Sequence, residues 1–301
     1  MLYSGYDVET PLSQVIDHYL AAQSNGQLAE TTLDGYTTIL RFFREFFEPK
    51  DPLPESIQPH HIDHFLSRHR HLSDKRLLNY YIVLSALWTW MQKRDYVTRH
   101  VVRMVDPPRY TQKDVIPYTE KELQKMMTAT WKMPWAGPMM RALVLTLAGT
   151  GIRNTEACKL KMRDIEDDQI RIRLGKGGKS RMVYLPRTAR DALAVYHSLR
   201  ENLEPDDYVF LNMHLEPLSR HRLYKLIQVL GEAAGIEEPT VHKFRHYFAV
   251  GFLKKNGDIR FLKDLLGHAD ISTTARYLNV TAEDVMDAAR KFNPLDGTQG
   301  K

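Results

Sequence analysis

Cysteine is almost absent from this chain: Cys158 is the only one, so no disulfide can form within it. The N-terminal residues lack the basic start and the apolar run of a secretory signal. The longest apolar stretch, near Leu143 to Ala148, is far too short to cross a membrane. We therefore expect a cytoplasmic protein with no membrane association and no disulfide framework.

The composition is that of a globular protein. The 301 residues are 43% hydrophobic and 26% charged, which allows a packed core, and this length favours two domains. The formal net charge of +5 suits a polyanionic partner, but many proteins that bind no nucleic acid are as basic. The placement of the basic and reactive side chains therefore has to decide the function.

The first hundred residues are predicted to be helical. Apolar side chains recur at helical spacing over 12–20 and 33–47. A third helix is expected to start after Pro59, and a fourth to run from Ser73 to Arg94 with Ser73 as its N-cap. Nothing in this part has the alternation of a strand.

A linker is predicted at 106–116, where two adjacent prolines stand among residues of mixed charge. It would join a helical domain at 1–105 to a second domain at 117–293. A mobile tail is expected at 294–301.

The second domain is predicted to combine helices with one β-hairpin. Two runs of period-2 alternation, 169–174 and 181–185, flank the glycine-rich segment 175–180. Thr119 and Glu122 have the spacing of a capping box. Helices are expected at 119–131, 138–149, 188–202, 219–234, 240–255, 258–266, 272–278 and 281–292. The predicted fold class is therefore mostly α with a small β-sheet in the second domain.

Several polar side chains of the second domain are candidates for chemistry. Arg153 follows 149–151 (Gly-Thr-Gly), a short loop that lets an arginine enter a site from the end of a buried helix. It could equally form a surface salt bridge with Glu156. His242 and Arg245 share a helix face because they are three residues apart, although such a pair is usually a solvated basic helix end.

Two further candidates follow near the end of the domain. Gly267 is placed to end a helix in the left-handed conformation, so that His268 projects from a rigid turn; a lone histidine there is usually structural. Tyr277 is a poor nucleophile alone because the pKa of a phenol is about 10, and a lone tyrosine in an amphipathic segment is usually a core residue. Nearby cations, with Arg276 among the candidates, would have to activate it.

The glycine-rich segment places Lys176 at the tip of the hairpin. Its end, 178–180 (Gly-Lys-Ser), resembles a phosphate-binding P-loop, but position 173 is Arg instead of the required glycine, and a strand leads to a strand. Contact with a nucleic-acid backbone is the better interpretation. It extends to the basic side chains around the tip: Arg171, Arg173, Lys179 and Arg181.

Five histidines lie close together in the sequence of the first domain, so a metal site has to be considered. His60 and His64 have i, i+4 spacing, and His61, His69 and His71 lie nearby. No glutamate completes an H-E-x-x-H pattern and no carboxylate cluster accompanies them. We favour a solvated or DNA-facing helix and expect no metal.

Taken together, the candidates in the second domain are two arginines, a lysine, two histidines and a tyrosine. This set suits phosphoryl transfer without a metal or another cofactor. Guanidinium groups match phosphate oxygens in pairs, and positive donors stabilise the charge that develops. A tyrosine supplies an oxygen nucleophile, and a lysine can protonate a leaving hydroxyl.

The order and spacing of these residues resemble the tyrosine recombinase (phage integrase) family, and within it the small Xer-like recombinases and integrases. The most specific segment runs from His242 and Arg245, through Leu-Gly-His at 266–268, to Tyr277. The stretches Gly-Thr-Gly-Ile-Arg at 149–153 and Gly-Lys-Gly at 175–177 resemble the other two family motifs. The resemblance covers nearly the whole chain.

The resemblance implies an enzyme that cleaves and rejoins DNA strands. Arg153 and Arg245 would clamp the scissile phosphate, and Tyr277 would attack it to form a 3′-phosphotyrosyl bond. Lys176 would protonate the departing 5′ oxygen. The two histidines would assist: His242 in removing the proton from the phenol, and the histidine at 268 in hydrogen-bonding the phosphate.

The resemblance also implies partners. The two domains would clamp double-stranded DNA, with basic residues of the first domain, including Arg41, Arg44, Lys75 and Arg76, along its backbone. Four protomers, identical or paired with a paralogue, would assemble on two duplexes through the C-terminal helix near 281–292 and pass through a Holliday junction. An accessory DNA-bending or directionality protein is a further expected partner.

The sequence departs from the Xer pattern at two places. Lys243 and Phe244 stand where a leucine usually precedes the arginine, and Asn-Thr-Glu at 154–156 replaces the commoner Val-Ser/Gly-Glu. Neither change touches a catalytic position, but both weaken assignment to the subgroup that resolves chromosome dimers. Two alternatives stay open: a catalytically silent DNA-binding regulator on the same fold, and a type IB topoisomerase-like enzyme with the same tyrosine chemistry.

Overall fold

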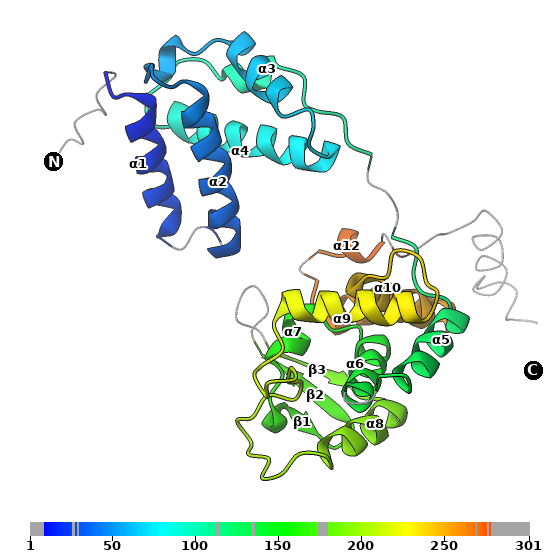
Figure 1. The fold of residues 1–301 in the computed structure, drawn as a ribbon. Helices are drawn as coiled ribbons and strands as arrows, with labels where there is room; N and C mark the ends of the chain where they lie inside the picture. Colours follow the sequence, from blue (N-terminus) through cyan, green and yellow to red (C-terminus); the bar gives the residue numbers. More distant parts are fainter. Residues whose placement is uncertain are drawn as a thin grey trace, which may run out of the picture. The chain divides into compact units, whose positions relative to one another are not determined.

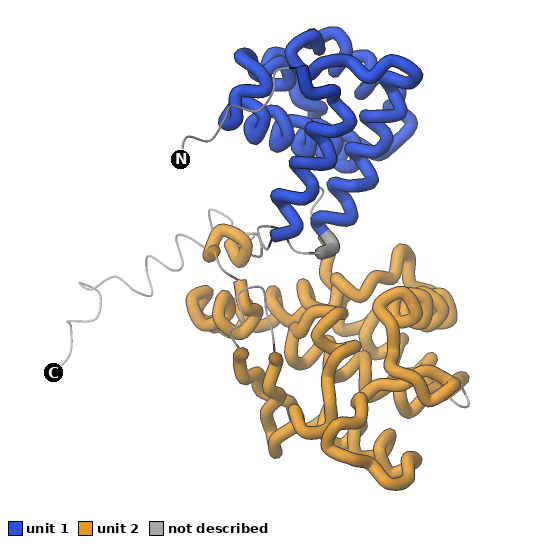
Figure 2. The backbone as a smooth tube through the Cα atoms, turned by 90° about the vertical axis from the view of Figure 1, so that its left-hand side faces the viewer, with its two compact units in different colours: residues 1–113 blue, residues 114–301 orange. Residues whose placement is uncertain are grey.

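The computed structural model describes residues 9–25, 28, 30–111, 115–133, 136–173, 180–268, 270–275 and 277. The chain forms two compact units, residues 1–113 and residues 114–301 (Figure 2). The boundary falls inside the segment 106–116. No helix among the described residues is both long and apolar enough to cross a membrane.

Unit 1 is built from helices, as predicted. They are α1 (Leu12–Ser24), α2 (Glu30–Phe46), α3 (Pro59–Arg68) and α4 (Asp74–Gln92), with single 3₁₀ turns at Pro54–Ser56 and Val101–Met104 (Figure 1). Pro59 is the first residue of α3, where its fixed φ suits the helix and its missing N–H is not needed. Ser73 occupies the N-cap position of α4, but its side chain makes no capping hydrogen bond.

Aromatic side chains fill the core of unit 1. Trp88 of α4 and Phe43 of α2 are fully buried and meet edge to face, with ring centroids 5.8 Å apart. Phe65 of α3 meets Phe43 in the same way at 5.0 Å. Edge-to-face pairs add to the free energy gained from burying these rings, so three helices are joined at one point.

Unit 2 adds a small sheet to a set of helices (Figure 1). The helices are α5 (Glu120–Thr130), α6 (Gly137–Thr150), α7 (Asn154–Lys159), α8 (Arg187–His197), α9 (Arg220–Ala233), α10 (Val241–Lys254), α11 (Ile259–Leu266) and α12 (Ser272–Ala275), with a 3₁₀ turn at Met162–Asp164. The strands are β1 (Ile165–Glu166), β2 (Gln169–Ile172) and β3 (Arg181–Tyr184). The fold is therefore mostly α with a small sheet, as predicted.

The strands of unit 2 are antiparallel in the order β1-β2-β3, and Ile170 of β2 pairs with Val183 of β3. Both of these side chains are buried, so the alternation that predicted the hairpin is confirmed. Strand β1 was not expected, because two residues are too few to show a period. The hairpin tip, 174–179, lies outside the described residues.

Helix α6 is the centre of unit 2. It is apolar around most of its surface because it packs against α5, α8 and α10. Thr119 and Glu122 form the predicted capping box at the start of α5. The predicted helices 119–131, 138–149, 219–234, 240–255 and 258–266 are confirmed with ends shifted by one residue or less.

Two predicted helices are shorter than expected. The helix expected at 188–202 ends at His197, because Arg200 turns back to donate to the carbonyls of Tyr208 and Val209, both at 3.0 Å. The helix expected at 272–278 ends at Ala275, so Tyr277 follows it in a turn. The predicted helix 281–292 and the predicted tail lie outside the described residues.

Candidate active site

The end of α6 places the first arginine. Gly151 closes the helix at φ 64°, and a Cβ at this position would lie 2.4 Å from the ring of Phe248, so glycine is required. Arg153 then stands at the N-cap of α7. Its guanidinium contacts Glu156 at 3.0 Å and donates to the carbonyl of Gly267, also at 3.0 Å.

The second arginine, Arg245, lies on α10 and is almost fully buried. It donates to the carbonyl of Gly151 at 2.8 Å and to that of Leu266 at 2.7 Å. Burial, and after it the nearby charge of Arg153, lowers the pKa of Arg245 to about 10. The guanidinium still carries its charge at neutral pH. Its fork is therefore fixed by the C-terminal ends of two helices, α6 and α11, where cations are favoured.

His268 projects from the turn that ends α11. Gly267 has φ 64°, which confirms the predicted left-handed conformation. Nε2 of His268 lies 2.7 Å from a guanidinium nitrogen of Arg245, and Nδ1 lies 2.8 Å from Oγ1 of Thr274. Because a guanidinium only donates, Nε2 must accept, and the ring proton is on Nδ1 and is donated to Thr274.

Tyr277 lies beside this pair. Its side chain is 7% exposed and packs in a small apolar cluster with Ala249, Leu262 and Leu266. Its ring is nearly parallel to that of His268, with centroids 6.3 Å apart. The structure therefore brings Tyr277, Arg245, His268 and, through the carbonyl of residue 267, Arg153 to one place in unit 2.

His242 is linked to the same region by His246, a residue that is not among the predicted site residues. Its ring meets that of His246 at 4.9 Å, and the ring of His246 meets that of Tyr277 at 4.8 Å. His242 and His246 are one helical turn apart on α10. That i, i+4 spacing was the available signal for His246.

The buried carboxylate of Glu156 forms ion pairs with Arg153 and Arg181. Glu156 accepts two hydrogen bonds from Arg181 of β3, at 2.9 and 2.8 Å, and one from the backbone N–H of Arg153 at 2.8 Å. Burial alone would raise the pKa of Glu156, but the hydrogen bonds from Arg181 and from the Arg153 backbone outweigh it and lower the pKa to about 2. Glu156 is thus a carboxylate at neutral pH.

Arg181 has a different environment from the one predicted. It was expected to contact a nucleic-acid backbone, but its side chain is only 13% exposed. It donates to Glu156 and, through Nε, to the carbonyl of Leu265 at 2.7 Å. The buried carboxylate needs a cationic partner, and no local pattern revealed this one because the two residues are 25 positions apart.

The other basic residues predicted to contact DNA differ in whether the structure gives them an ion pair within the protein. Arg44 pairs with Asp17, Arg41 with Glu45, Arg171 with Glu166 and Arg173 with Asp164. Lys75 and Arg76 are exposed at the start of α4. Lys176 and Lys179 lie outside the described residues.

Two histidines of unit 1 form hydrogen bonds with backbone groups. Nδ1 of His61 accepts from the N–H of Gln58 at 3.0 Å, and Nδ1 of His69 lies 2.8 Å from the carbonyl of Phe65. Within the part of the chain that the structure describes, no group of three or more His, Cys, Asp or Glu side chains is arranged to hold a metal ion.

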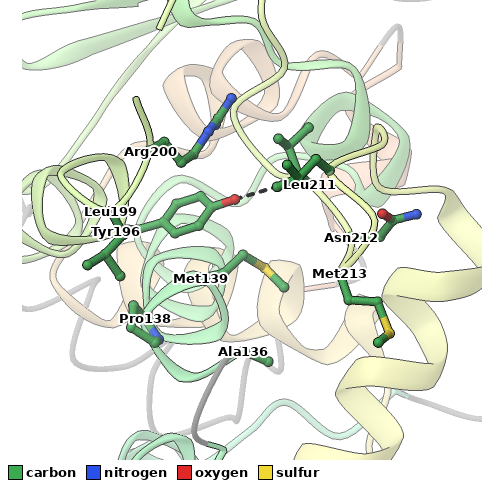
Figure 3. A pocket seen from close by; sticks show the side chains of 10 residues that line it. Ala136, Pro138, Met139, Tyr196, Leu199, Arg200, Leu211, Asn212 and Met213 are labelled. Carbon is green, nitrogen blue, oxygen red and sulfur yellow. Dashed lines mark hydrogen bonds between the residues drawn. The ribbon is translucent and has the colours of Figure 1, made fainter. Parts of the chain in front are cut away.

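Unit 2 also has a pocket of about 430 Å³ (Figure 3). Its lining includes Met139 of α6, Tyr196 of α8 and Leu211, and the Tyr196 hydroxyl accepts from the N–H of Leu211 at 3.3 Å. None of its lining residues belongs to the predicted catalytic set. The candidate active site is instead the polar cluster around Arg245.

Comparisons with known proteins identify relatives of the chain. Residues 118–284 match the model of the phage integrase family. The tyrosine recombinase XerD of Listeria innocua is 28% identical over 288 residues, which cover 92% of this chain and 96% of that protein. The tyrosine recombinase XerC of Pediococcus pentosaceus is 30% identical, covering 75% and 78%. A lambda integrase tetramer bound to a Holliday junction has a similar fold, with a TM-score of 0.75 at 19% identity, covering 89% of this chain and 77% of that one.

Proposed function

The chain belongs to the phage integrase family and is a tyrosine recombinase, and on this premise we propose that Tyr277 is the nucleophile that cuts and rejoins DNA at a specific site. The observation that supports this assignment most strongly is the 2.7 Å contact between Arg245 and His268 beside the ring of Tyr277. A buried arginine, a histidine and a phenol converge there from three separate segments of the chain.

The two arginines would bind the scissile phosphate. Arg153 donates to a carbonyl at the end of α11, and Arg245 donates to carbonyls at the ends of α6 and α11, so backbone carbonyls hold both guanidinium groups. A fixed cation costs no reorganisation when charge develops on the phosphate oxygens. His268 would add a hydrogen bond to the same oxygens.

The chemical step exchanges one phosphodiester for another. The phenolic oxygen of Tyr277 bonds to phosphorus while the bond from phosphorus to the 5′ oxygen breaks. His242 accepts the phenolic proton, and Lys176 supplies a proton to the departing 5′ oxygen. The product is a 3′-phosphotyrosyl bond and a free 5′ hydroxyl.

Rejoining reverses these transfers. A 5′ hydroxyl from a partner duplex attacks the phosphotyrosyl bond and releases Tyr277, so strand exchange passes through a Holliday junction. Because each step replaces one phosphate ester with another, the bond energy is retained, and the residues named here suffice without a metal or ATP.

Assembly on DNA completes the proposal. Residues 1–105 would form the DNA-binding domain and 117–293 the catalytic domain, with 106–116 as the linker between them, closing around the duplex in the cytoplasm. The lambda integrase tetramer on a Holliday junction supports four protomers on two duplexes. The segment 281–292 would join neighbouring protomers, which are either identical or paired with a paralogue. An accessory protein would set the direction of exchange.

Strand exchange tests this function against its alternatives. The DNA site is first located by footprinting, beginning with the DNA that flanks the gene. Two labelled duplexes bearing the site should then yield recombinant products. Relaxation of supercoils without exchange would favour a topoisomerase, and specific binding without cleavage would favour a silent regulator; either result would overturn the recombinase assignment.

A further inference from the structure

His246 is buried in the wall of the candidate site, yet it is outside the catalytic set. It follows Arg245 directly on α10, and its side chain is only 6% exposed. Its ring contacts that of the proposed nucleophile, Tyr277, so it can affect where the phenol lies without taking part in the chemistry.

The ring of His246 contacts two other rings of the site. It meets His242 at a centroid distance of 4.9 Å and an interplanar angle of 71°, and it meets Tyr277 at 4.8 Å and 75°. Both contacts are edge to face, the favoured geometry for aromatic pairs. One residue thus contacts both the proposed proton acceptor and the proposed nucleophile.

Side-chain contacts help to place the ring of Tyr277. Helix α12 ends at Ala275, and the N–H of Tyr277 donates to the carbonyl of Thr274 at 3.0 Å in the turn that follows. The phenol ring also contacts two neighbouring rings: His268 stacks nearly parallel to it at 6.3 Å, and His246 meets it at a steep angle. Because the rings of His268 and His246 contact the phenol at different angles, they restrict both its rotation and its translation.

We propose that His246 is a positioning residue for Tyr277, and that the shape of its ring, not proton transfer through its nitrogens, holds the phenol beside Arg245 and His268. This inference rests on the proposed function of Tyr277. A nucleophile displaced by about 1 Å can lose on the order of 100-fold in rate, so the loss of this wall should appear in the chemical step.

Two substitutions separate the ring from its nitrogens. His246→Phe keeps an aromatic ring of similar size and removes both nitrogens, whereas His246→Ala removes the ring. His197→Ala is a matched control, because His197 is a partly buried histidine of the same unit that also packs against a tyrosine, Tyr196, at 5.4 Å. Single-turnover cleavage of a nicked suicide duplex is measured at saturating DNA, beside the affinity for that duplex and the melting temperature.

The expected pattern is a loss confined to the rate of cleavage. His246→Ala should slow cleavage by roughly 10- to 100-fold with unchanged affinity, and should do so well below its melting temperature. His246→Phe and His197→Ala should cleave at close to the wild-type rate. Wild-type cleavage by His246→Ala would overturn the inference, and so would equal losses in His246→Ala and His246→Phe, which would assign the role to the nitrogens. Failure of the wild-type protein to form an adduct would count instead against the proposed function.

Discussion

Arg245 donates to Nε2 of His268 across 2.7 Å, and this contact fixes which nitrogen of the histidine carries the proton. Nε2 faces the guanidinium as an acceptor, while Nδ1–H donates to Thr274 at 2.8 Å. To donate to a phosphate, Nε2 must first gain a proton or exchange its partner. The two proposed phosphate ligands therefore contact each other directly.

Thr274→Val should weaken catalysis by releasing the ring of His268. The hydroxyl of Thr274 is fully buried, and valine has a similar shape without the acceptor oxygen. Loss of one hydrogen bond, worth about 1 kcal/mol, predicts a fall of roughly fivefold in the single-turnover rate of cleavage. Thr273→Val, at the exposed neighbouring position, is the control and should cleave normally. Equal rates for both variants would show that Thr274 does not orient the histidine.

Glu156→Gln should destabilise unit 2 and change its response to acid. Removing one partner of a buried ion pair costs roughly 3 kcal/mol, because Arg181 and Arg153 lose their carboxylate. The folded pKa of Glu156, about 2, lies below its ordinary value near 4.5, so its stabilisation is complete above that value and is lost as the pH falls towards 2.

Thermal melts over a range of pH measure this effect. Wild-type protein should lose melting temperature from about pH 5 downward, and Glu156→Gln should start lower and fall less. Glu166→Gln is the control, since Glu166 forms an exposed pair with Arg171. Parallel curves for wild type and Glu156→Gln would contradict the buried ion pair.

Lys176→Ala should slow cleavage only on a DNA substrate whose leaving oxygen needs a proton. On an ordinary duplex, cleavage should fall by on the order of 100-fold or more, the range for general acid catalysis. A duplex with sulfur in place of the bridging 5′ oxygen releases a thiolate, which needs no proton because the pKa of a thiol is about 8.5. This substrate should restore cleavage by Lys176→Ala and leave Tyr277→Phe inactive. Equal defects on both substrates would remove Lys176 from the role of acid.

Lys75 and Arg76 should contribute to DNA affinity through charge alone. Both are exposed at the start of α4, and replacing them with alanine should weaken binding to every sequence alike. Removing one cation from a DNA phosphate makes the slope of log affinity against log salt shallower by about 0.9. Arg44→Ala should change the slope less, because Arg44 is paired with Asp17 at 2.5 Å. An unchanged slope in the double variant would place this face away from DNA.

Local patterns in the sequence predicted much of the fold and part of the site. The glycines at 151 and 267 stand where apolar helices end, and both are left-handed as such positions require. The alternation around 169–174 and 181–185 predicted the hairpin, because a half-buried strand has a period of two.

Contacts between distant residues could not be predicted in this way. Arg181 looked like a DNA ligand because it is basic and lies on the hairpin, but its partner is a carboxylate 25 residues earlier. The helix predicted before Tyr277 is longer than α12, since no residue type marks the end of α12 at Ala275. The ring contacts of His246 cannot be predicted from the sequence, because they depend on where the turn places the tyrosine.

A covalent complex with DNA is the most direct test of the central claim. Incubating the protein with a nicked suicide duplex of its own site should yield an adduct that survives denaturation. Mass spectrometry of the digested adduct should place the nucleotide on the peptide containing Tyr277, and Tyr277→Phe should form no adduct while binding the duplex normally. An adduct on another residue, or one that persists in Tyr277→Phe, would contradict the assignment of Tyr277 as the nucleophile.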